Sequence, residues 1–600
     1  MGKRKTKAAD YKPDTDPPGE MPLRGKLDRR FNEAWAVADT FRPRWRALGE
    51  YLAPTRPAFA AQDHNKGNRS NDKIIDSTAL QAAEIAKTGL LQGMASPSRP
   101  WFTVDTPSGI SRYDRMAYGW LQSYRDAILN TMDRSNFYTS LGVLLDDEVK
   151  FGTGTMAIFE DDNKVIRCQT FPIGSYALSQ NDRGRVDTFC RRIVMSARQA
   201  ASKFGREKLS QKVQQMLESG RVESAVAVRH MIAPNESFAE GTIGPGGRRF
   251  REWYWEESEL ARSGRTDEVR YGGQGGMAFD APVLQEGGYS EFPIIAGRWD
   301  KNDDDVWGTS YPGIVSLGDN MMLQQMSRKF LNALEKMINP PLLVDPALDN
   351  KTVSLLAGSR TSGPTNQGGQ SVRPIHELRY PLQESEYAME QVRVRIRKAF
   401  MEPLFLMLIG DARSTPPTAE EIRAREREKA SILGPINERH SDDVFDPAIE
   451  RIAAIMLRRS QRDWVQNQPG MIPPPPPSLR KQELRVEYIS EVAQSQRLAG
   501  LSGIERHVQF VGGIATVAPQ ALDVVDWDEV VRESGRVSGI PAQLNRDDEF
   551  VQAIRKQRQQ AQQQAQMAQS VPAMAGAAKD LAATDGSGKT TVDRLKGAIG

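Results

Sequence analysis

Residues 384–425 read ESEYAMEQVRVRIRKAFMEPLFLMLIGDARSTPPTAEEIRAR, and this stretch decides the fold that we expect. Apolar residues recur in its first half at every third or fourth position, the spacing of a helix that buries one face. Val392, Val394 and Ile396 also alternate with arginines, as in a strand. We favour the helix because its period continues on both sides of this alternation. The expected buried positions are Met389, Val392, Ile396, Phe400, Leu404 and Met407.

The middle of the stretch predicts a loop between two helices. Pro403 lacks a backbone donor and is expected to kink the end of the first helix. Residues 409–417 are rich in glycine, proline and short polar side chains, which interrupt the helical period. Thr418 resembles a helix cap, with Glu420 and Glu421 at the positive end of the new helix dipole. Two long helices would therefore present this loop far from the body of the fold.

The second helix is expected to continue to about Leu457, bent where Pro435 and Pro447 remove backbone donors. Its apolar stripe consists of Ile422, Ala430, Leu433, Ile436, Phe445, Ile449, Ile452 and Met456.

Length and composition indicate a protein of several subdomains. The 600 residues exceed what one hydrophobic core usually organises. The 80 basic and 77 acidic residues leave a net charge of +3. This balance argues against tight binding of nucleic acid, where a basic domain is usual, but is compatible with a polyanion that slides past. The sequence shows neither a signal peptide nor an apolar run long enough to cross a bilayer, so we expect assembly in a cytoplasm.

Cysteines and histidines give no support for a metal or redox site. Cys168 and Cys190 both fall in expected strands. A cross-strand disulfide is conceivable, but reduced core thiols are favoured in a reducing compartment. The five histidines are scattered, without a second ligand at metal spacing. We expect no cofactor.

Before the deciding stretch, the pattern changes from helices to strands. Helices are expected over 28–51, 77–94, 111–132 and 136–151, with Ser77, Ser111 and Asn136 as caps. From Gly152 onward the period becomes two. The expected strands are 155–159, 165–171, 186–194, 222–230, 251–255 and 293–299, with one helical interruption over 197–217.

A second rod-like helix is expected over 313–338, ended by Pro340 and Pro341. The excursion that follows, to residue 383, is too short for a domain, and its apolar ends imply a partner subunit. Beyond the prolines at 473–477 we expect a strand over 484–489, short helices at 491–498, 504–510 and 527–533, and a Gln- and Ala-rich stretch over 551–569 that can be helical.

Three local patterns match functional motifs, but the sequence around them gives these interpretations little support. Residues 583–590 fit a relaxed phosphate-loop pattern, but no apolar strand precedes them, so a polar tail is favoured. Residues 272–276 are glycine-rich without the strand-turn-helix frame of a dinucleotide site. Met1 and Gly2 with Thr6 formally fit N-myristoylation, which alone favours a membrane-anchored assembly factor.

Several motifs, taken together and in order, resemble podovirus-type bacteriophage portal proteins, the head-to-tail connectors of short-tailed phages. The resemblance covers roughly residues 25–515. The motifs are GLLQGMASPSRPWF at 89–102, GTG at 152–154, FPIGSY at 171–176 with GRVDT at 184–188, WGTSYPG at 307–313, and TAEEIRARERE at 418–428 with LGP at 433–435.

The resemblance implies an α+β, helix-rich protomer with an α/β wing, a two-helix stem, a small clip, a kinked long helix and a helical crown. The implied regions are a flexible arm (1–24), wing (25–305), first stem helix (306–340), clip (341–383), second stem helix (384–408), tunnel loop (409–417), long kinked helix (418–467), crown (468–550) and a flexible C-terminal tail (551–600).

The same resemblance implies a structural function rather than catalysis. Twelve copies would form a ring at one capsid vertex, through which double-stranded DNA is packaged and ejected without being read by sequence. The implied partners are terminase, adaptor or tail proteins, scaffold and major capsid protein, with no membrane. The implied location is the virion, after assembly in the host bacterial cytoplasm.

We expect the loop residues Gly410, Asp411, Ala412, Arg413, Ser414 and Thr415 to face DNA. The expected channel and stem charges are Arg393, Arg395, Arg397, Lys398, Arg423 and Arg425. The competing class is an enzyme, a packaging ATPase or nuclease. The sequence offers it no framed phosphate loop, acidic metal cluster or catalytic triad.

Overall fold

The structure is a computed structural model, and it describes residues 23–54, 73–107, 109, 114–242, 244–257, 283–344, 372–374, 381–406, 432–466, 470–480, 482–489, 503–514, 518–537 and 550–564. These residues belong to two compact units. The first consists of Met1–Gly109 with Trp120–Val492, and the second of Ile110–Gly119 with Ala493–Gly600. The described part is helix-rich with antiparallel sheets, which confirms the expected α+β class.

Four long helices open the chain, close to the expected ranges. They are α1 (Leu23–Leu52), α2 (Thr78–Met94), α3 (Arg115–Arg134) and α4 (Phe137–Phe151).

Two of the expected helix caps lie at the predicted positions but do not make the expected bond. Ser77 and Asn136 occupy cap positions, but their side chains accept no cap hydrogen bond. Asp76 instead accepts from the Thr78 amide, and Ser135 accepts from the Phe137 amide. The third expected cap, Ser111, lies outside the described residues.

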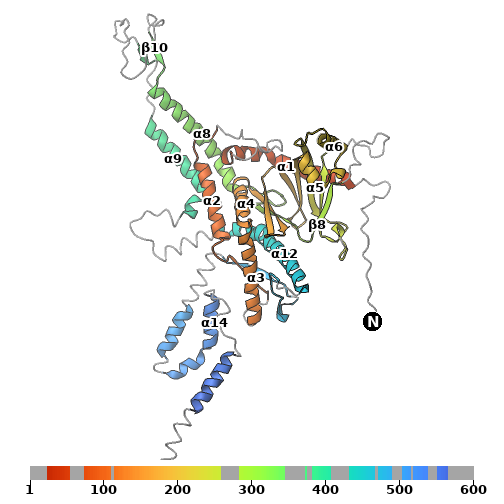
Figure 1. The fold of residues 1–600 in the computed structure, drawn as a ribbon. Coiled ribbons are helices and arrows are strands. Elements are labelled where there is room, and N and C mark those ends of the chain that lie inside the picture. The colour runs from red at the N-terminus through yellow and green to blue at the C-terminus, as the bar shows by residue number, and fades with distance from the viewer. Residues whose placement is uncertain are drawn as a thin grey trace, which may run out of the picture. The chain divides into compact units, whose positions relative to one another are not determined.

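The larger sheet has five antiparallel strands in the order β4 (Tyr176–Gln180), β5 (Val186–Ser196), β6 (Ala225–Pro234), β7 (Phe250–Glu256) and β8 (Gln285–Tyr289) (Figure 1). Two short helices, α5 (Ala197–Phe204) and α6 (Gln211–Glu218), cover one face around Val228 and Tyr254. The helical stretch expected over 197–217 is present but divided, because Gly205 turns the chain at φ 88° between the two helices.

Helix α1 packs against the other face of this sheet. The Asp28 carboxylate accepts hydrogen bonds of 2.8 Å from both the Arg229 guanidinium and the Trp255 indole. The Phe31 ring meets Trp255 edge-on at 5.7 Å. The sheet is thus buried on both faces, with a buried ion pair beneath α1.

A smaller sheet orders its strands as β3 (Val165–Phe171), β2 (Thr153–Asp161) and β9 (Ile294–Arg298), and α4 packs on it. Cys168 lies in β3 and Cys190 in β5, and both thiols are free and buried, as expected. Burial raises the pKa of each to about 12, so both are unreactive near neutral pH.

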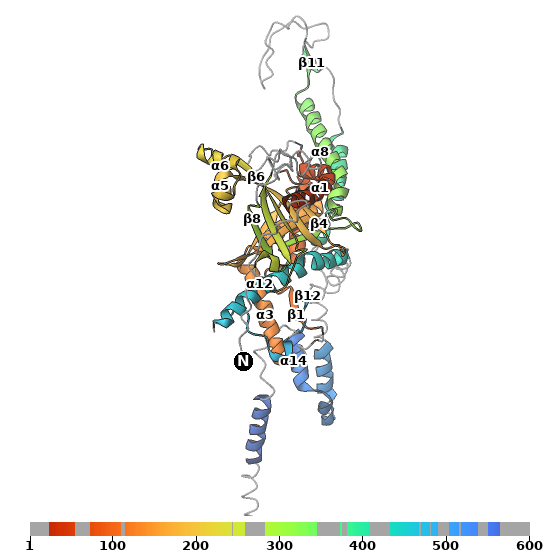
Figure 2. The ribbon, with the colours of Figure 1, turned by 90° about the vertical axis from the view of Figure 1, so that its right-hand side faces the viewer.

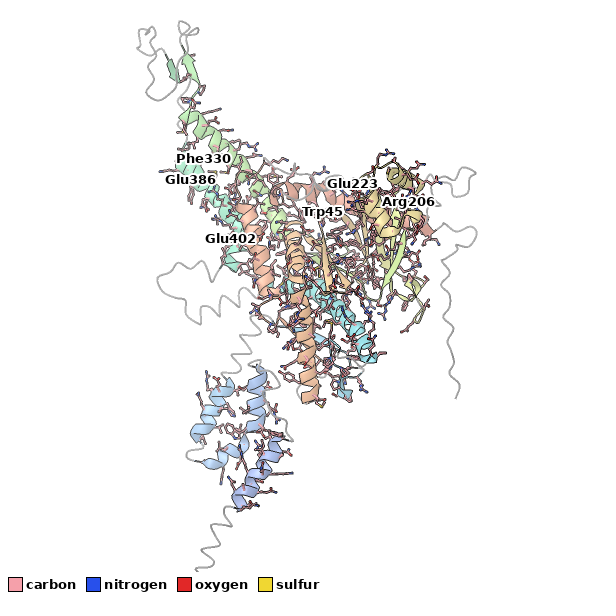
Figure 3. The ribbon with its side chains drawn as sticks, in the orientation of Figure 1. Trp45, Arg206, Glu223, Phe330, Glu386 and Glu402 are labelled. Carbon is pink, nitrogen blue, oxygen red and sulfur yellow. The ribbon has the colours of Figure 1, made fainter. Side chains whose placement is uncertain are left out.

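Two long helices, α8 (Tyr311–Ile338) and α9 (Leu382–Ala399), lie side by side, and the short strands β10 (Leu342–Val344) and β11 (Val372–Pro374) pair between their distal ends (Figures 1 and 2). The helical interpretation is confirmed for the first part of the deciding stretch, up to Ala399, and the alternation at 392–396 does not produce a strand. Figure 3 locates Phe330 on α8 and Glu386 on α9. We call this pair the rods.

The kink expected at Pro403 is instead an interruption of the helix two residues earlier. Helix α9 ends at Ala399, Met401 adopts a left-handed backbone at φ 56°, and α10 (Glu402–Phe405) follows. Phe400 and Leu404 remain buried across the interruption, as their helical spacing predicted. Met407 lies outside the described residues.

The next described helix runs from residue 432 to 465 without a gap. It contains a π turn at Ser441–Phe445, and α12 (Asp446–Val465) continues from there. The sequence predicted an irregularity near Pro447, and the structure has this π turn just before it. The π turn moves the hydrogen-bond register one residue further, so the amide of Asp446, directly before the proline, donates to the Ser441 carbonyl.

The first unit closes with a pairing of distant segments. Strand β12 (Arg485–Tyr488), expected from the sequence, pairs antiparallel with β1 (Phe102–Asp105), which was not. Residues 470–489 belong to the first unit, whose last segment ends at Val492.

The described C-terminal part of the second unit is helical, with helices over 503–514, Trp527–Val537 (α14) and 550–564. Arg555 joins the last helix to α14 through two 2.7 Å hydrogen bonds to Asp528.

Candidate functional site

Two polar junctions fix the helices on either side of residues 407–431 to the body of the first unit. The rod junction consists of Asp76, Asn320, Gln324, Glu390 and Arg393. The π-turn junction consists of Glu148, Arg298, His440 and Asp443. The predicted loop at 409–417 lies between these anchored helices, outside the described residues.

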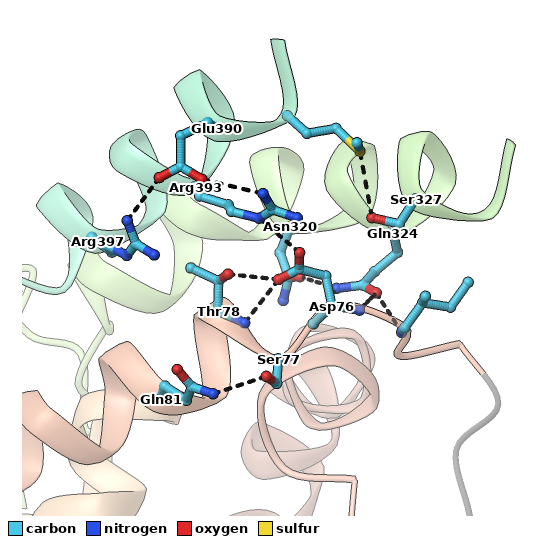
Figure 4. A network of polar contacts seen from close by, with 12 residues as sticks. Asp76, Ser77, Thr78, Gln81, Asn320, Gln324, Ser327, Glu390, Arg393 and Arg397 are labelled. Atoms are coloured by element: carbon cyan, nitrogen blue, oxygen red, sulfur yellow. Dashed lines mark hydrogen bonds and ion pairs between the residues drawn. The ribbon is translucent and has the colours of Figure 1, made fainter. Parts of the chain in front are cut away.

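The rod junction centres on Asp76, just before α2 (Figure 4). Its carboxylate accepts from the amide and hydroxyl of Thr78 and, at 2.9 Å, from Nε of Arg393 on α9. Burial raises the pKa of Asp76, but these hydrogen bonds outweigh it and hold the pKa below its ordinary value. The carboxylate is thus a fixed negative charge that joins α9 to the body.

Helix α8 joins the same point through an amide pair. The Gln324 carbonyl oxygen accepts from the amides of Ile75 and Asp76 at 2.6 and 2.9 Å. Its amide nitrogen donates to the Asp76 carbonyl and to Asn320, and Asn320 in turn donates to the Tyr51 carbonyl. Both rods are therefore tied to a single short segment.

Three of the four expected stem charges that the structure describes are neutralised within the chain. Arg393 and Arg397 both contact Glu390, while Arg395 makes two hydrogen bonds to Asp319 of α8. Lys398 is exposed and has no ion pair among the described residues. Arg423 and Arg425, like residues 410–415, fall outside the described ranges.

The π-turn junction is more deeply buried. His440 donates from Nδ1 to the Ile436 carbonyl at 2.7 Å, and its Nε2 lies 3.0 Å from the Glu148 carboxylate of α4. Because both neighbouring groups are acceptors, they favour the form of the ring with a proton on each nitrogen. Burial lowers the pKa of His440, yet the facing Glu148 carboxylate outweighs it and raises the pKa above its ordinary value.

The second ion pair of this junction joins the π turn to β9. Arg298 donates from Nε and Nη2 to the two oxygens of Asp443 at 2.8 and 2.6 Å. Its remaining donors bind the Gly184 carbonyl and the Gln180 side chain. Such a bidentate pair fixes orientation as well as distance.

Gly297 is what lets these groups meet. A side-chain carbon there would lie 2.8 Å from both the Glu148 carboxylate and the Val444 side chain. The absence of a side chain at this position on β9 therefore permits α4 and the π turn to approach the same point.

Sequence reasoning missed the junction residues, including Asp76, Glu148, Arg298, His440 and Asp443. Two signals were present: an Asp-Ser-Thr helix start at 76–78, and Pro447 inside a helical pattern. Neither identifies a partner, because the partners are 145 or more residues apart in the chain.

The structure supplies no constellation for catalysis in the residues that it describes. No group of three or more His, Cys, Asp or Glu side chains is placed to hold a metal ion within that part of the chain. His230, Glu252 and Tyr254 form a buried cluster, with His230 Nε2 and the Tyr254 hydroxyl bonded to one Glu252 oxygen. Burial lowers the pKa of His230 to about 4, so its ring is neutral near pH 7 and the cluster is a buried part of the core.

Comparison with known proteins places these features in a family. The model of the bacteriophage head to tail connecting protein family matches residues 24–272 and 276–545. The chain belongs to this family.

Two connecting-protein relatives match almost end to end. The portal protein of Salmonella phage epsilon15 is 34% identical over 566 residues, covering 94% of this chain and 96% of the relative. The probable portal protein of Bordetella phage BPP-1 is 29% identical over 543 residues, covering 90% and 92%. A chain from the neck of an empty gene transfer agent particle covers 75% of this chain and 92% of its own length, but its TM-score of 0.32 and 11% identity carry no argument.

Two motifs of the family resemblance meet in the structure. Gly152 ends α4 in the left-handed region at φ 92°, and a side-chain carbon there would lie 2.4 Å from the Ser310 amide. Gly308 donates to the Thr153 hydroxyl and packs equally closely on the Gly152 carbonyl. In this connecting protein the GTG and WGTS motifs are thus a backbone-to-backbone packing site at the base of α8.

No helix in the described ranges of this connecting protein is long and apolar enough to cross a membrane.

Proposed function

We propose that this chain is a portal subunit, many copies of which form a channel at one capsid vertex through which phage DNA enters and leaves. The observation that supports this most is the match to a portal protein at 34% identity across 94% of the chain. The family match over nearly the same range agrees with it. The chain acts structurally, without catalysis of its own.

The rods support assembly into a ring. Helix α8 buries one side against α9 and the body, but it also carries exposed apolar residues along its length. Exposed apolar residues on a helix favour burial against another protein. The exposed residues are Tyr311, Ile314, Val315, Met322, Leu331, Met337 and Ile338. We assign the rods to the stem and β10 with β11 to the clip, and we propose twelve copies.

The paired arginines suit a channel that DNA must pass through. A guanidinium already bonded to a carboxylate of its own chain has less to gain from a phosphate. Twelve unpaired cations in symmetric positions would exceed the about 6 to 10 phosphate contacts that give tight, salt-dependent binding. We propose that Gly410–Thr415 contact DNA sterically and weakly, with Arg423 and Arg425 nearby.

The proposed partners follow the portal assignment. Terminase, and later adaptor or tail proteins, would bind at the clip, and scaffold and major capsid protein would contact the wing, the sheet-containing body at 25–305. The chain would assemble in the bacterial cytoplasm and remain in the virion.

Electron microscopy of the purified full-length chain tests the proposal. Annular particles about twelve-fold symmetric, with a hole wide enough for duplex DNA, are expected. ATP hydrolysis and DNA cleavage should both be undetectable in the same preparation. Solitary chains at all concentrations, or particles without an opening, would contradict the portal assignment, and ATP hydrolysis that co-purifies with the ring would support a packaging ATPase instead.

Replacing Arg413 by Ala tests the loop separately. Because the loop is proposed to contact DNA and not the neighbouring subunit, rings should form normally, while the length or retention of packaged DNA changes. Arg198→Ala, which removes only an exposed pair with Glu223 in the sheet-containing body, is the matched control. Normal packaging by Arg413→Ala would remove the loop from the mechanism.

A further inference from the structure

The run of five prolines at 473–477, which we call the proline segment, is bonded to the chain's own helix α3. The indole Nε1 of Trp120 on α3 donates a hydrogen bond of 2.8 Å to the Pro473 carbonyl, across 353 positions of sequence. Trp120 also stacks on Tyr124, one helical turn further along α3, with ring centroids 5.0 Å apart. The helix and the proline segment both belong to the first unit.

The backbone of the proline segment is suited to such a donor. Consecutive prolines favour the polyproline II helix, which is extended and has no internal hydrogen bonds. Pro476 has the backbone angles of that helix, with φ −61° and ψ 158°. Because prolines have no N–H, their carbonyls are satisfied by water or by a donor from elsewhere. The indole N–H of tryptophan, which donates and never accepts, is complementary to these carbonyls.

The proline segment bridges two buried anchors on the surface of the unit. Before it, the Ile472 amide donates to the Ser460 hydroxyl of α12 at 3.1 Å, and Ile472 is fully buried. After it, Leu479 is buried. The exposed residues between the anchors include Pro473, Pro474 and Pro477. The prolines can therefore leave α3 while both anchors stay in place.

An aromatic donor on a helix and a rigid, donor-free ligand are the two parts of proline recognition, in which polyproline II segments bind to aromatic-lined surfaces. The ligand loses little conformational entropy when it binds, because its shape is already fixed. Since Trp120 bonds to a backbone carbonyl, the contact selects the shape of the ligand rather than particular side chains.

We propose that α3 carries a proline-recognition site centred on Trp120, which binds the chain's own proline segment and takes a polyproline II segment of another protein when its own is displaced. The proline segment thus keeps the site closed to other proline-rich ligands. The site lies within a single chain and does not depend on ring formation.

A full-length chain with an emptied site tests the proposal. Replacing residues 473–477 by alternating glycine and serine keeps the length of the connection and removes the polyproline II shape. A fluorescently labelled peptide of ten prolines is titrated into this emptied chain and into the parent, and its anisotropy is measured. Binding is expected to be about tenfold tighter, or more, to the emptied chain, because the parent's own segment competes at an effective concentration of the order of millimolar.

The controls for this titration are a labelled glycine-serine peptide of the same length and the circular dichroism of both chains. The glycine-serine peptide should not bind. Absence of polyproline binding to a folded emptied chain would overturn the proposal, as would equal binding of the two peptides or equal affinity of the two chains for polyproline.

Trp120→Phe in the emptied chain tests the donor. Phenylalanine keeps an aromatic ring but lacks the N–H, so the affinity for the polyproline peptide should fall about 2- to 10-fold, the value of one hydrogen bond. Trp464→Phe on α12 is the matched control. A side-chain carbon at Gly470 would lie 2.6 Å from Trp464 Nε1, which has no hydrogen-bond partner among the described residues. An equal loss in both variants, or no loss in Trp120→Phe, would overturn the role of Trp120.

A second measurement leaves the prolines unaltered, so it decides the matter even where the emptied chain does not fold. Arg480 is exposed and follows the proline segment closely. Trypsin cleavage after Arg480 reports how often the segment is released, because cleavage follows the population of the open form. Trp120→Phe should accelerate this cleavage about 2- to 10-fold, whereas Trp464→Phe should not. Cleavage of Trp120→Phe at the parent's rate would overturn the proposal.

Discussion

The two junctions perform the same task by different physical means. At the rod junction, the Arg393 and Asp76 side chains are 25% and 10% exposed. At the π-turn junction, Arg298 is 4% exposed, and His440 and Glu148 are 0% and 1% exposed. A partly hydrated pair loses little when it opens, because water replaces the partner, whereas a buried charge left alone is costly. The comparison predicts that opening the π-turn junction costs much more free energy than opening the rod junction.

The largest effect is expected from Arg298→Met. This change leaves the Asp443 carboxylate without its bidentate partner, and breaking a buried pair from one side costs about 3 to 5 kcal/mol. Urea unfolding followed by tryptophan fluorescence would measure the lost free energy of unfolding in the first unit. The double variant Arg298→Met/Asp443→Leu should recover most of that loss. A single variant as stable as the parent would place this pair in the same class as the rod junction.

The next largest difference between the two junctions is expected in how their contribution to stability depends on pH. Because the folded pKa of His440 is raised above its unfolded value near 6.5, its stabilisation is complete below that pH and is lost as pH rises through the higher folded pKa. The slope can reach about 1.4 kcal/mol per pH unit for one proton. Unfolding curves between pH 6 and pH 9 measure it, and Glu148→Gln should flatten them.

The stability contributed by the rod junction is expected to change with pH in the opposite direction. The lowered pKa of Asp76 means that its stabilisation is present above the unfolded value of 3.8 and is lost as pH falls through the lower folded pKa. Acid should thus release the rods and mild alkali the π turn. Release of both over one pH range would contradict the assignment of separate charges to the two junctions.

A smaller loss is expected from Arg393→Ala. The half-buried pair with Asp76 is worth about 1 to 2 kcal/mol, since the hydrogen bonds from Thr78 still satisfy the carboxylate. Hydrogen exchange should accelerate in 73–78 and in α9, but not in α12. Acceleration in α12 as well would show that the two junctions open together.

The smallest loss of stability is expected from Arg395→Ala, which is the control for Arg393→Ala. The Arg395 side chain is 52% exposed and joins α9 to α8 rather than to the body. Exposed pairs contribute about 0 to 1 kcal/mol, so exchange in 73–78 should not change. An effect equal to that of Arg393→Ala would mean that contact between the rods, not their anchorage, controls α9.

Periodicity predicted the elements whose faces are buried uniformly. The rods and the strands with strict alternation, such as 165–171, follow from the sequence because burial dictates their apolar spacing. Strand β8 was missed because Gly287 and Gly288 carry no side chains to alternate, although Gly287 packs against the Glu252 carboxylate. Strand β1 was missed because its partner β12 is distant in the chain.

The junctions could not be predicted for a related reason. Glu148 lies on the buried side of α4, where spacing alone predicts an apolar residue, and only the arrival of His440 explains the acid. A π turn leaves no repeat in a sequence, since it inserts one residue once. Arg393 was predicted to be a channel charge, and its bond to Asp76 depends on a contact across 317 positions.

The pairing of β1 with β12 has a consequence for synthesis. Phe102 lies opposite Tyr488, so the small sheet that closes the body cannot form until the ribosome has made nearly the whole first unit. At about 5 to 20 residues per second, the about 390 intervening residues take roughly 20 to 80 s to translate. During that interval the nascent chain has an incomplete body, and chaperones have time to bind it.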